Sequence, residues 1–159
     1  KFRQEENPDL TNVSSTSTWV EIRLAEVLLN LAEAEYKLGN DAAAMGYIAQ
    51  VRDRVGLPTD ESLTGDAVFE ALVHERKIEL AYEGHLWWDM RRWKLSEEAF
   101  TGYRVHGLKI TKEGSGYRYQ YVDADGQDRK FLNRMYRLPI PDAELQNNNA
   151  IEQFPEWNF

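Results

Sequence analysis

Three glutamates spaced four residues apart are candidates for acid–base chemistry in this 159-residue chain. Glu75, Glu79 and Glu83 fall on one face of a predicted helix, because residues four apart are neighbours on a helix surface. Two carboxylates could act as acid and base on a glycosidic bond if they lay roughly 5 to 9.5 Å apart across a cleft. A row of like charges is also unfavourable unless cations answer it. We therefore favour a structural ion-pair network over a catalytic pair.

Arginines that could answer this row are present before and after it. The planar guanidinium group binds a carboxylate through two parallel hydrogen bonds, which suits Arg to such a role. Arg76 lies in the same helical turns, and Arg91 and Arg92 follow a bend predicted at Gly84, from which the chain could fold back. The predicted network comprises Arg23, Glu26, Glu75, Arg76, Glu79, Glu83, Arg91 and Arg92.

Tyr117, Tyr119 and Tyr121 form the candidate carbohydrate-binding site. Alternate residues of a strand point to one side, so the three rings share a face. Aromatic faces can stack on the C–H surfaces of sugars, and phenol hydroxyls can form hydrogen bonds with them. The alternative, which we prefer for this face, is that it packs on the helices.

The group formed by Trp87, Trp88, Met90 and Trp93 is likewise predicted to be mostly core rather than a sugar platform.

Several kinds of site are excluded by the motifs. His74-Glu75 begins like a zinc-protease motif, but Ile78 stands where the second His ligand is needed, so no metal site is predicted. The chain has no Gly-rich phosphate loop and no Gly-x-Ser-x-Gly elbow. It has no Cys, which excludes disulfides and thiolate chemistry. We expect no cofactor and no catalytic residues.

The amino-acid composition limits the kinds of partner that this chain is expected to bind. The chain has 19 Lys and Arg against 27 Asp and Glu, a net charge of −8, which makes nucleic acid an unfavourable partner. Apolar residues make up 42% and charged residues 29%, as in globular proteins, and the length predicts a single domain over residues 1–159. No apolar run is long enough to cross a membrane.

Hydrophobic periodicity predicts a mainly α fold. A first helix follows Thr18, which has the capping-box spacing with Glu21, and ends at Gly39. After a turn at Asn40 and Asp41, a second helix carries Ala44, Tyr47, Ile48 and Val51 on one face and ends at Gly56. The short link makes this pair antiparallel, like a tetratricopeptide-type helical hairpin. A third helix spans residues 65–83, and a shorter one follows to residue 93.

The remaining segments are predicted to be extended, apart from one short helix. Residues 1–18 are polar and are interpreted as an extended lead-in. Residues 103–110, 117–122 and 129–138 are rich in aromatic and branched side chains and are separated by Gly-containing turns. They predict a small three-stranded antiparallel β-meander, inserted over residues 102–138. A short helix is expected at residues 142–146.

The run HERKIELAYEGHLWWDMRRW at residues 74–93 resembles the C-terminal region of the SusD/RagB family. Leu138-Pro139-Ile140-Pro141 and the closing Gln153-x-Pro155 resemble the same family, in the same order. The resemblance implies a tetratricopeptide-like protein without catalytic chemistry, which binds glycans and delivers them to a SusC-like TonB-dependent transporter.

The resemblance also implies a place in the cell and leaves one alternative open. Family members are surface-exposed lipoproteins of the outer membrane in Bacteroidetes-like bacteria, so membrane association would depend on a lipid anchor upstream of residue 1. The alternative is a protein-interaction module that docks the transporter and has no sugar site of its own.

Overall fold

The computed structural model describes residues 20–102 and 104–158. The predicted lead-in at residues 1–18, including the cap at Thr18, and the first residue of the predicted meander, Tyr103, lie outside the described residues. The chain divides into two compact units, Lys1–Glu83 and Gly84–Phe159. The expectation of a single domain stays a prediction.

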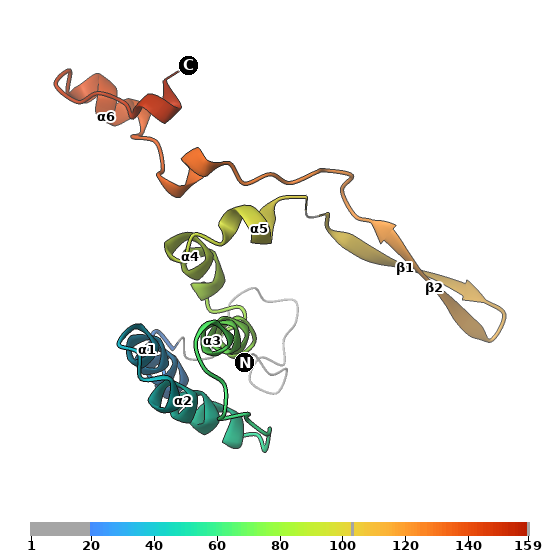
Figure 1. Cartoon of the computed structure of the whole chain (residues 1–159). Helices are drawn as coiled ribbons and strands as arrows, with labels where there is room; N and C mark the ends of the chain where they lie inside the picture. The colour runs from blue at the N-terminus through green and yellow to red at the C-terminus, as the bar shows by residue number, and fades with distance from the viewer. Residues whose placement is uncertain (1–19, 103, 159) are drawn as a thin grey trace. The chain divides into compact units, whose positions relative to one another are not determined.

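Helices α1 (Leu24–Lys37), α2 (Asp41–Asp53) and α3 (Asp66–Glu79) make up the described part of the first unit (Figure 1). Gly39, at φ +82°, turns the chain between α1 and α2, as the predicted left-handed cap requires. The three helices bury a common core, formed by Leu29, Ala32, Ala44, Met45, Ile48, Val51, Val68, Leu72 and Leu80. This core holds α3 against the α1–α2 hairpin, as the helical periodicity predicts.

Helix α1 begins later than predicted. Residues 20–23 are not helical, and Arg23 has extended backbone angles, φ −135° and ψ 159°. The first helical hydrogen bond runs from the Val27 N–H to the Arg23 carbonyl, at 3.2 Å. The Arg23 side chain is held by glutamates of the α3 segment, which places the entry of the chain into α1. A long-range contact therefore sets this boundary.

Helix α3 ends at Glu79, before the predicted end at Glu83. The turn that follows contains two residues with left-handed backbone angles, Tyr82 at φ 65° and Gly84 at φ 84°. A right-handed helix cannot continue through such residues. The predicted bend at Gly84 is confirmed, but Glu83 lies in the turn and not on the helix.

The second unit contains short helices and one β-hairpin. After α4 (His85–Arg92) and α5 (Ser96–Phe100), strands β1 (His106–Glu113) and β2 (Gly116–Asp123) pair antiparallel (Figure 1). A 3-10 helix, η2 (Asn133–Tyr136), helix α6 (Asp142–Asn147) and a second 3-10 helix, η3 (Pro155–Trp157), follow. Helix α6 agrees with the helix predicted at residues 142–146.

The predicted third strand is wrong. In the described part of residues 102–138 the sheet has two strands, and residues 129–138 contain η2 instead. One backbone bond, from the Gly102 N–H to the Arg129 carbonyl, joins the two ends of the segment. The Met135 and Tyr136 carbonyls accept hydrogen bonds from the Arg91 guanidinium group. A side chain thus takes acceptors that a third strand would have used.

The tryptophan group is less buried than predicted. Met90 is buried and Trp93 half-buried, but Trp88 is 60% exposed. The buried aromatic centre of this unit is Phe131, whose ring lies 5.7 Å from that of Trp87 and 4.8 Å from that of Tyr136. Successive residues of a short helix point in different directions, so α4 can bury only part of the group.

Truncating Leu72 to Ala should lower the free energy of unfolding by about 2–5 kcal/mol, because it opens a cavity in the core. Leu72 is fully buried, whereas Ile78, on the same helix, is 58% exposed. Ile78→Ala is therefore the matched control and should cost well under half as much. Urea unfolding of both variants measures the difference, and equal losses would contradict the described core.

Candidate functional site

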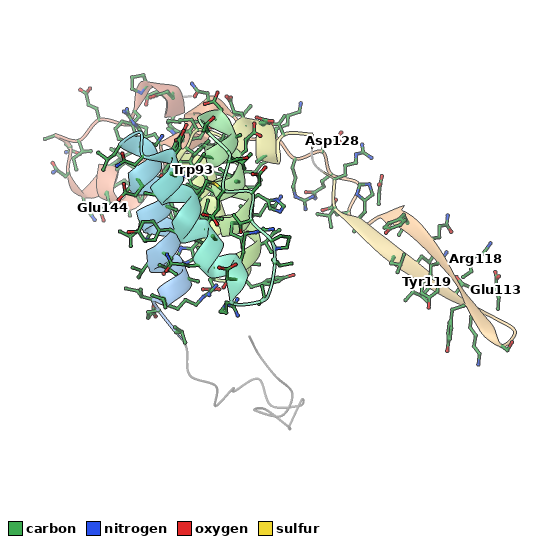
Figure 2. The ribbon with its side chains drawn as sticks, turned by 60° about the horizontal axis from the view of Figure 1, so that its bottom comes forward. Trp93, Glu113, Arg118, Tyr119, Asp128 and Glu144 are labelled. Carbon is green, nitrogen blue, oxygen red and sulfur yellow. The ribbon has the colours of Figure 1, made fainter. Side chains whose placement is uncertain are left out.

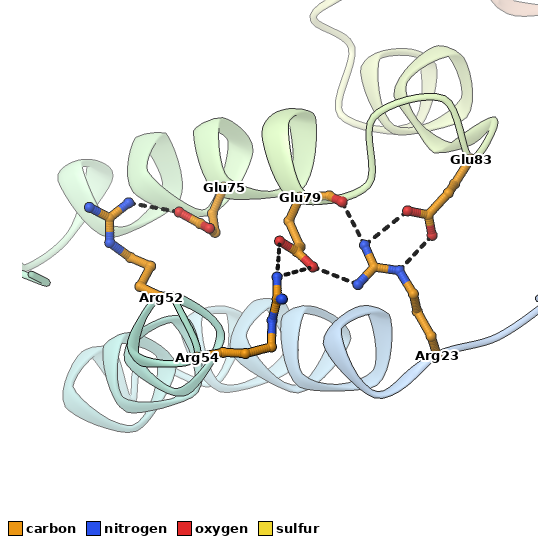
Figure 3. Close-up of polar contacts among 6 residues, drawn as sticks. All are labelled: Arg23, Arg52, Arg54, Glu75, Glu79 and Glu83. Carbon is orange, nitrogen blue, oxygen red and sulfur yellow. Dashed lines mark hydrogen bonds and ion pairs between the residues drawn. The ribbon is translucent and has the colours of Figure 1, made fainter. Parts of the chain in front are cut away.

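Arg23 joins two glutamates of the predicted row (Figure 3). Its Nε and Nη2 donate to the two carboxylate oxygens of Glu83, at 2.7 and 2.9 Å, in a bidentate pair. Its Nη1 donates to Glu79 Oε1, and its Nη2 also donates to the Glu79 backbone carbonyl, each at 2.5 Å. One side chain thus ties the start of α1 to the end of α3 and to the turn beyond it.

Two further arginines, from the end of α2, complete the arrangement (Figure 3). Arg54 Nη2 lies 3.0 and 3.2 Å from the carboxylate oxygens of Glu79, and Arg52 Nη1 donates to Glu75 at 2.8 Å. Arg52 also donates twice to the Pro58 carbonyl, at 3.0 and 2.8 Å. Arg52 and Arg54 were missing from the predicted network. Their place at the end of a helix antiparallel to its neighbour was the signal that could have found them.

Arg76, Arg91 and Arg92, also predicted members of the network, form hydrogen bonds outside the glutamate row. Arg76 donates to Asn30 Oδ1 at 2.7 Å, which joins α3 to the middle of α1. Arg92 donates to Asp89 at 2.9 Å within α4, and Arg91 donates to the backbone near η2. Glu26, also predicted, lies in the first turn of α1. The hydrogen bonds from Arg91 to the Met135 and Tyr136 carbonyls and from Arg92 to Asp89 lie within the second unit.

The environment of the three glutamates favours the structural interpretation. Glu75 is buried, Glu79 and Glu83 are half-buried, and each carboxylate accepts a hydrogen bond from an arginine. An acid–base pair must instead present its carboxyl groups to a substrate. Oxygens that are already engaged by guanidinium groups are poorly suited to proton transfer, so this cluster is best described as a clamp among α1, α2 and α3.

An open hollow of about 840 Å³ lies next to this clamp. Its apolar lining comes from α1 and α2, through Leu24, Leu28 and Val51, and its charged lining includes Arg54 and Glu79. It continues onto an exposed apolar stripe of α1 that contains Leu24, Val27, Leu31 and Leu38. Helix α1 is therefore apolar on two sides, one in the core and one uncovered.

The predicted tyrosine site lies on one exposed face of the hairpin. Tyr117, Tyr119 and Tyr121 are 60, 61 and 83% exposed. Tyr119 lies on β2 beside Arg118, whose side chain belongs to the opposite face (Figure 2). Within the second unit, therefore, this face does not pack on the helices. A two-stranded sheet has two faces, and here the face that bears the tyrosines is exposed.

The cross-strand register adds residues that sequence reasoning missed. Tyr121 lies opposite Leu108, Tyr119 opposite Ile110 and Tyr117 opposite Lys112. Directly opposite residues share a face of the sheet. We call these six residues the tyrosine face. The alternation of Leu108, Ile110 and Lys112 was visible in the sequence, but their pairing depended on the position of the turn.

Ion pairs hold the base of the hairpin. Arg104 donates to Asp128 at 2.6 Å and to Asp123 at 2.9 Å, and these two bonds raise the pKa of Arg104 further above its ordinary value. The hydrogen bond from Arg104 lowers the pKa of Asp128. The Gln127 backbone N–H, followed by Arg129, lowers the pKa of Asp125. The lowered pKa values favour the charged forms of Asp125 and Asp128, and arginines already engage all three carboxylates at this end of the hairpin.

Comparison with known proteins agrees with this fold. SusD-like protein P2 of Formosa agariphila is 31% identical over 153 residues, which cover 90% of this chain and 26% of that protein. SusD-like protein P25 of the same organism is 41% identical over 133 residues, 81% of this chain and 22% of that protein. This chain therefore spans about a quarter of the length of these relatives.

Solved structures show the same likeness. The crystal structure of a SusD-like protein from Bacteroides fragilis superposes with a TM-score of 0.75 at 29% identity, over 87% of this chain and 26% of that one. A SusD superfamily protein from Bacteroides vulgatus gives a TM-score of 0.58 at 27% identity, over 91% of this chain and 29% of that one.

A helical hairpin packed on a third helix, with a small antiparallel hairpin after it, defines a mainly α protein of the tetratricopeptide-like type. The model of the SusD family matches residues 1–157, and the chain belongs to that family. These proteins are outer-membrane lipoproteins of polysaccharide utilisation in Bacteroidetes, and they are generally binding proteins without catalysis. Among the helices that the structure describes, none has the length and apolar character to cross a membrane.

Replacing Glu79 by Gln should lower the free energy of unfolding by about 1–3 kcal/mol, because Arg23 and Arg54 both lose a charged partner in a half-buried setting. Glu70→Gln, at an exposed position of α3, is the matched control and should change it by less than about 0.5 kcal/mol. Urea unfolding tests both variants. A fully stable Glu79→Gln protein would contradict the clamp.

Replacing Arg104 by Gln should raise the pKa of Asp128, because the charged donor that lowers it is lost. NMR titration of the Asp128 carboxyl group measures the change directly. Lys112→Gln removes the same charge from β1 and should leave that pKa nearly unchanged. An unaltered Asp128 pKa in the Arg104 variant would contradict the described ion pairs.

Proposed function

We propose that this chain is a glycan-binding module without catalytic activity, and that the tyrosine face contacts the sugar. The observation that carries this proposal is an exposed row of three tyrosines in a chain of the SusD family. Single exposed apolar residues are common on protein surfaces, but a contiguous apolar and aromatic patch usually marks a binding site.

The shape of the tyrosine face suits an extended chain of sugars. Tyr117 and Tyr121 are four residues apart on β2, so the row spans about 14 Å at the antiparallel rise per residue. This is longer than a single sugar ring. Leu108 and Ile110, which are exposed opposite two of the tyrosines, widen the apolar surface beside the rings. The continuous pairing of β1 and β2 holds the three rings in a fixed spacing before binding.

Delivery to a transporter is the second part of the proposal. SusD family members generally work with a SusC-like TonB-dependent transporter. We propose that the polypeptide containing this chain hands its glycan to such a transporter at the cell surface. Its attachment to the outer membrane would then come from a lipid anchor in a preceding segment.

A protein-interaction module is the second candidate, and the exposed stripe of α1 favours it. Leu24, Val27, Leu31 and Leu38 recur at spacings of three, four and seven residues along one side of the helix. With the adjoining hollow, this surface has the form that receives an amphipathic helix. In this alternative the chain docks the transporter and the sugar binds elsewhere.

Replacing Tyr119 by Ala should weaken glycan binding about tenfold, because the central ring of the row is lost. Isothermal titration calorimetry, with ligands first found on a broad array of neutral and anionic glycans, measures this loss. Tyr119→Phe keeps the ring and should retain most of the affinity. Gln120→Ala, on the opposite face of the same strand, should have no effect.

Three results would count against the tyrosine face. Equal losses in the Tyr119→Ala and Gln120→Ala proteins would indicate a general defect of the hairpin. Binding unchanged by Tyr119→Ala would place the sugar site elsewhere. Failure to bind any glycan on the array would favour the protein-interaction module. In that case, Leu31→Glu should abolish binding to the transporter.

A further inference from the structure

The hairpin differs in charge from the rest of the chain. Residues 104–130 contain six Lys and Arg against four Asp and Glu, whereas the whole chain has a net charge of −8. At physiological ionic strength, charges more than about 8 Å apart are largely screened. A ligand on the hairpin therefore experiences mainly the local, positive balance.

Ion pairs already engage the acidic residues of this segment. Arg118 binds Glu113 at 2.9 Å, and Arg129 binds Asp125 at 2.5 Å. Arg104 holds the two remaining carboxylates. Within residues 20–102 and 104–158, the side chains of Lys109 and Lys112 of β1 form neither a hydrogen bond nor an ion pair. The uncompensated positive charge of the strands is thus carried by two lysines.

The register places these two lysines on opposite faces. Lys112 lies opposite Tyr117, so it belongs to the tyrosine face and stands at the end of the row nearest the turn. Lys109 lies opposite Gln120, on the other face. The tyrosine face therefore combines three exposed rings with one ammonium group that, among the described residues, has no carboxylate to bind.

We infer that the tyrosine face takes an anionic glycan, with sugar rings over the tyrosines and a carboxylate or sulfate group at Lys112. This inference rests on the proposed glycan-binding function and adds the chemical class of the sugar. A neutral glycan would use the rings and leave the ammonium group unmatched, whereas uronic acid or sulfated units place an anion beside rings that stack.

The contribution of Lys112 should be modest, because it is an exposed ion pair screened by salt. An exposed pair of this kind corresponds to an affinity change of about threefold to fivefold at low ionic strength. Stacking on the tyrosines remains the larger part of the affinity. The charge of Lys112 then determines which of several similarly shaped glycans binds most tightly.

The test compares matched glycans and matched variants of the 159-residue chain. The ligands are polygalacturonate oligosaccharides and their carboxyl-reduced neutral counterparts, and carrageenan oligosaccharides with their desulfated forms. The array supplies further pairs of this kind if another backbone binds better. Calorimetry at about 20 and 200 mM salt measures each affinity for the unaltered chain and for the Lys112→Gln and Lys109→Gln variants.

The anionic member of each pair should bind about threefold to fivefold more tightly than the neutral member. Higher salt should reduce this difference in affinity, and Lys112→Gln should abolish it. Lys109→Gln changes the net charge equally and should keep the preference. A response to carboxylated but not sulfated glycans, or the reverse, identifies the source of the anion.

Equal binding of charged and neutral partners overturns the inference and leaves the proposed function standing. Equal losses in both Lys variants also overturn it, because they show a general effect of charge. The absence of binding to any glycan overturns the inference and the proposed function together.

Discussion

The first unit depends on the ion pairs between the glutamates around the end of α3 and the arginines of α1 and α2. Arg23 alone makes four hydrogen bonds to Glu79 and Glu83. Half-buried carboxylates lose part of their hydration, so they are tolerated only where cations replace the water. The same contacts decide where α1 begins and fix the turn after α3.

These pairs also explain why a row of glutamates need not be an active site. Glu79 is shared by Arg23 and Arg54, and Glu75 is held by Arg52. Such an arrangement fixes the positions of three helices, and it leaves the carboxylate oxygens occupied by guanidinium groups. Acid–base catalysis would need one of them to exchange a proton with a ligand. The motif that identifies the family is therefore better explained as scaffold than as chemistry.

The hairpin has the opposite character. Two strands cannot bury both of their faces, so an isolated ribbon keeps one side available for a ligand. Exposed strands with apolar side chains also risk pairing with other chains, and Lys or Arg on such strands opposes this. Lys109 and Arg118, on the face opposite the tyrosines, are placed to do so. The rings and the two aliphatic side chains of the tyrosine face, Leu108 and Ile110, can then stay exposed.

The local sequence was sufficient for helices α1 to α4 and α6 apart from some of their ends, for the left-handed cap at Gly39, for the bend at Gly84 and for the family, because periodicity and backbone limits act over a few residues. Alternation along a strand was likewise enough to put Tyr117, Tyr119 and Tyr121 on one face. The tertiary structure decided which arginines meet the glutamates, since Arg52 and Arg54 reach them only through the packing of α2 on α3. It also replaced the third strand by η2 and left the tyrosines exposed. Several residues distant in sequence could contact each carboxylate, carbonyl or apolar face. Which of them does so depends on how the helices and strands pack, and local sequence patterns do not determine that packing.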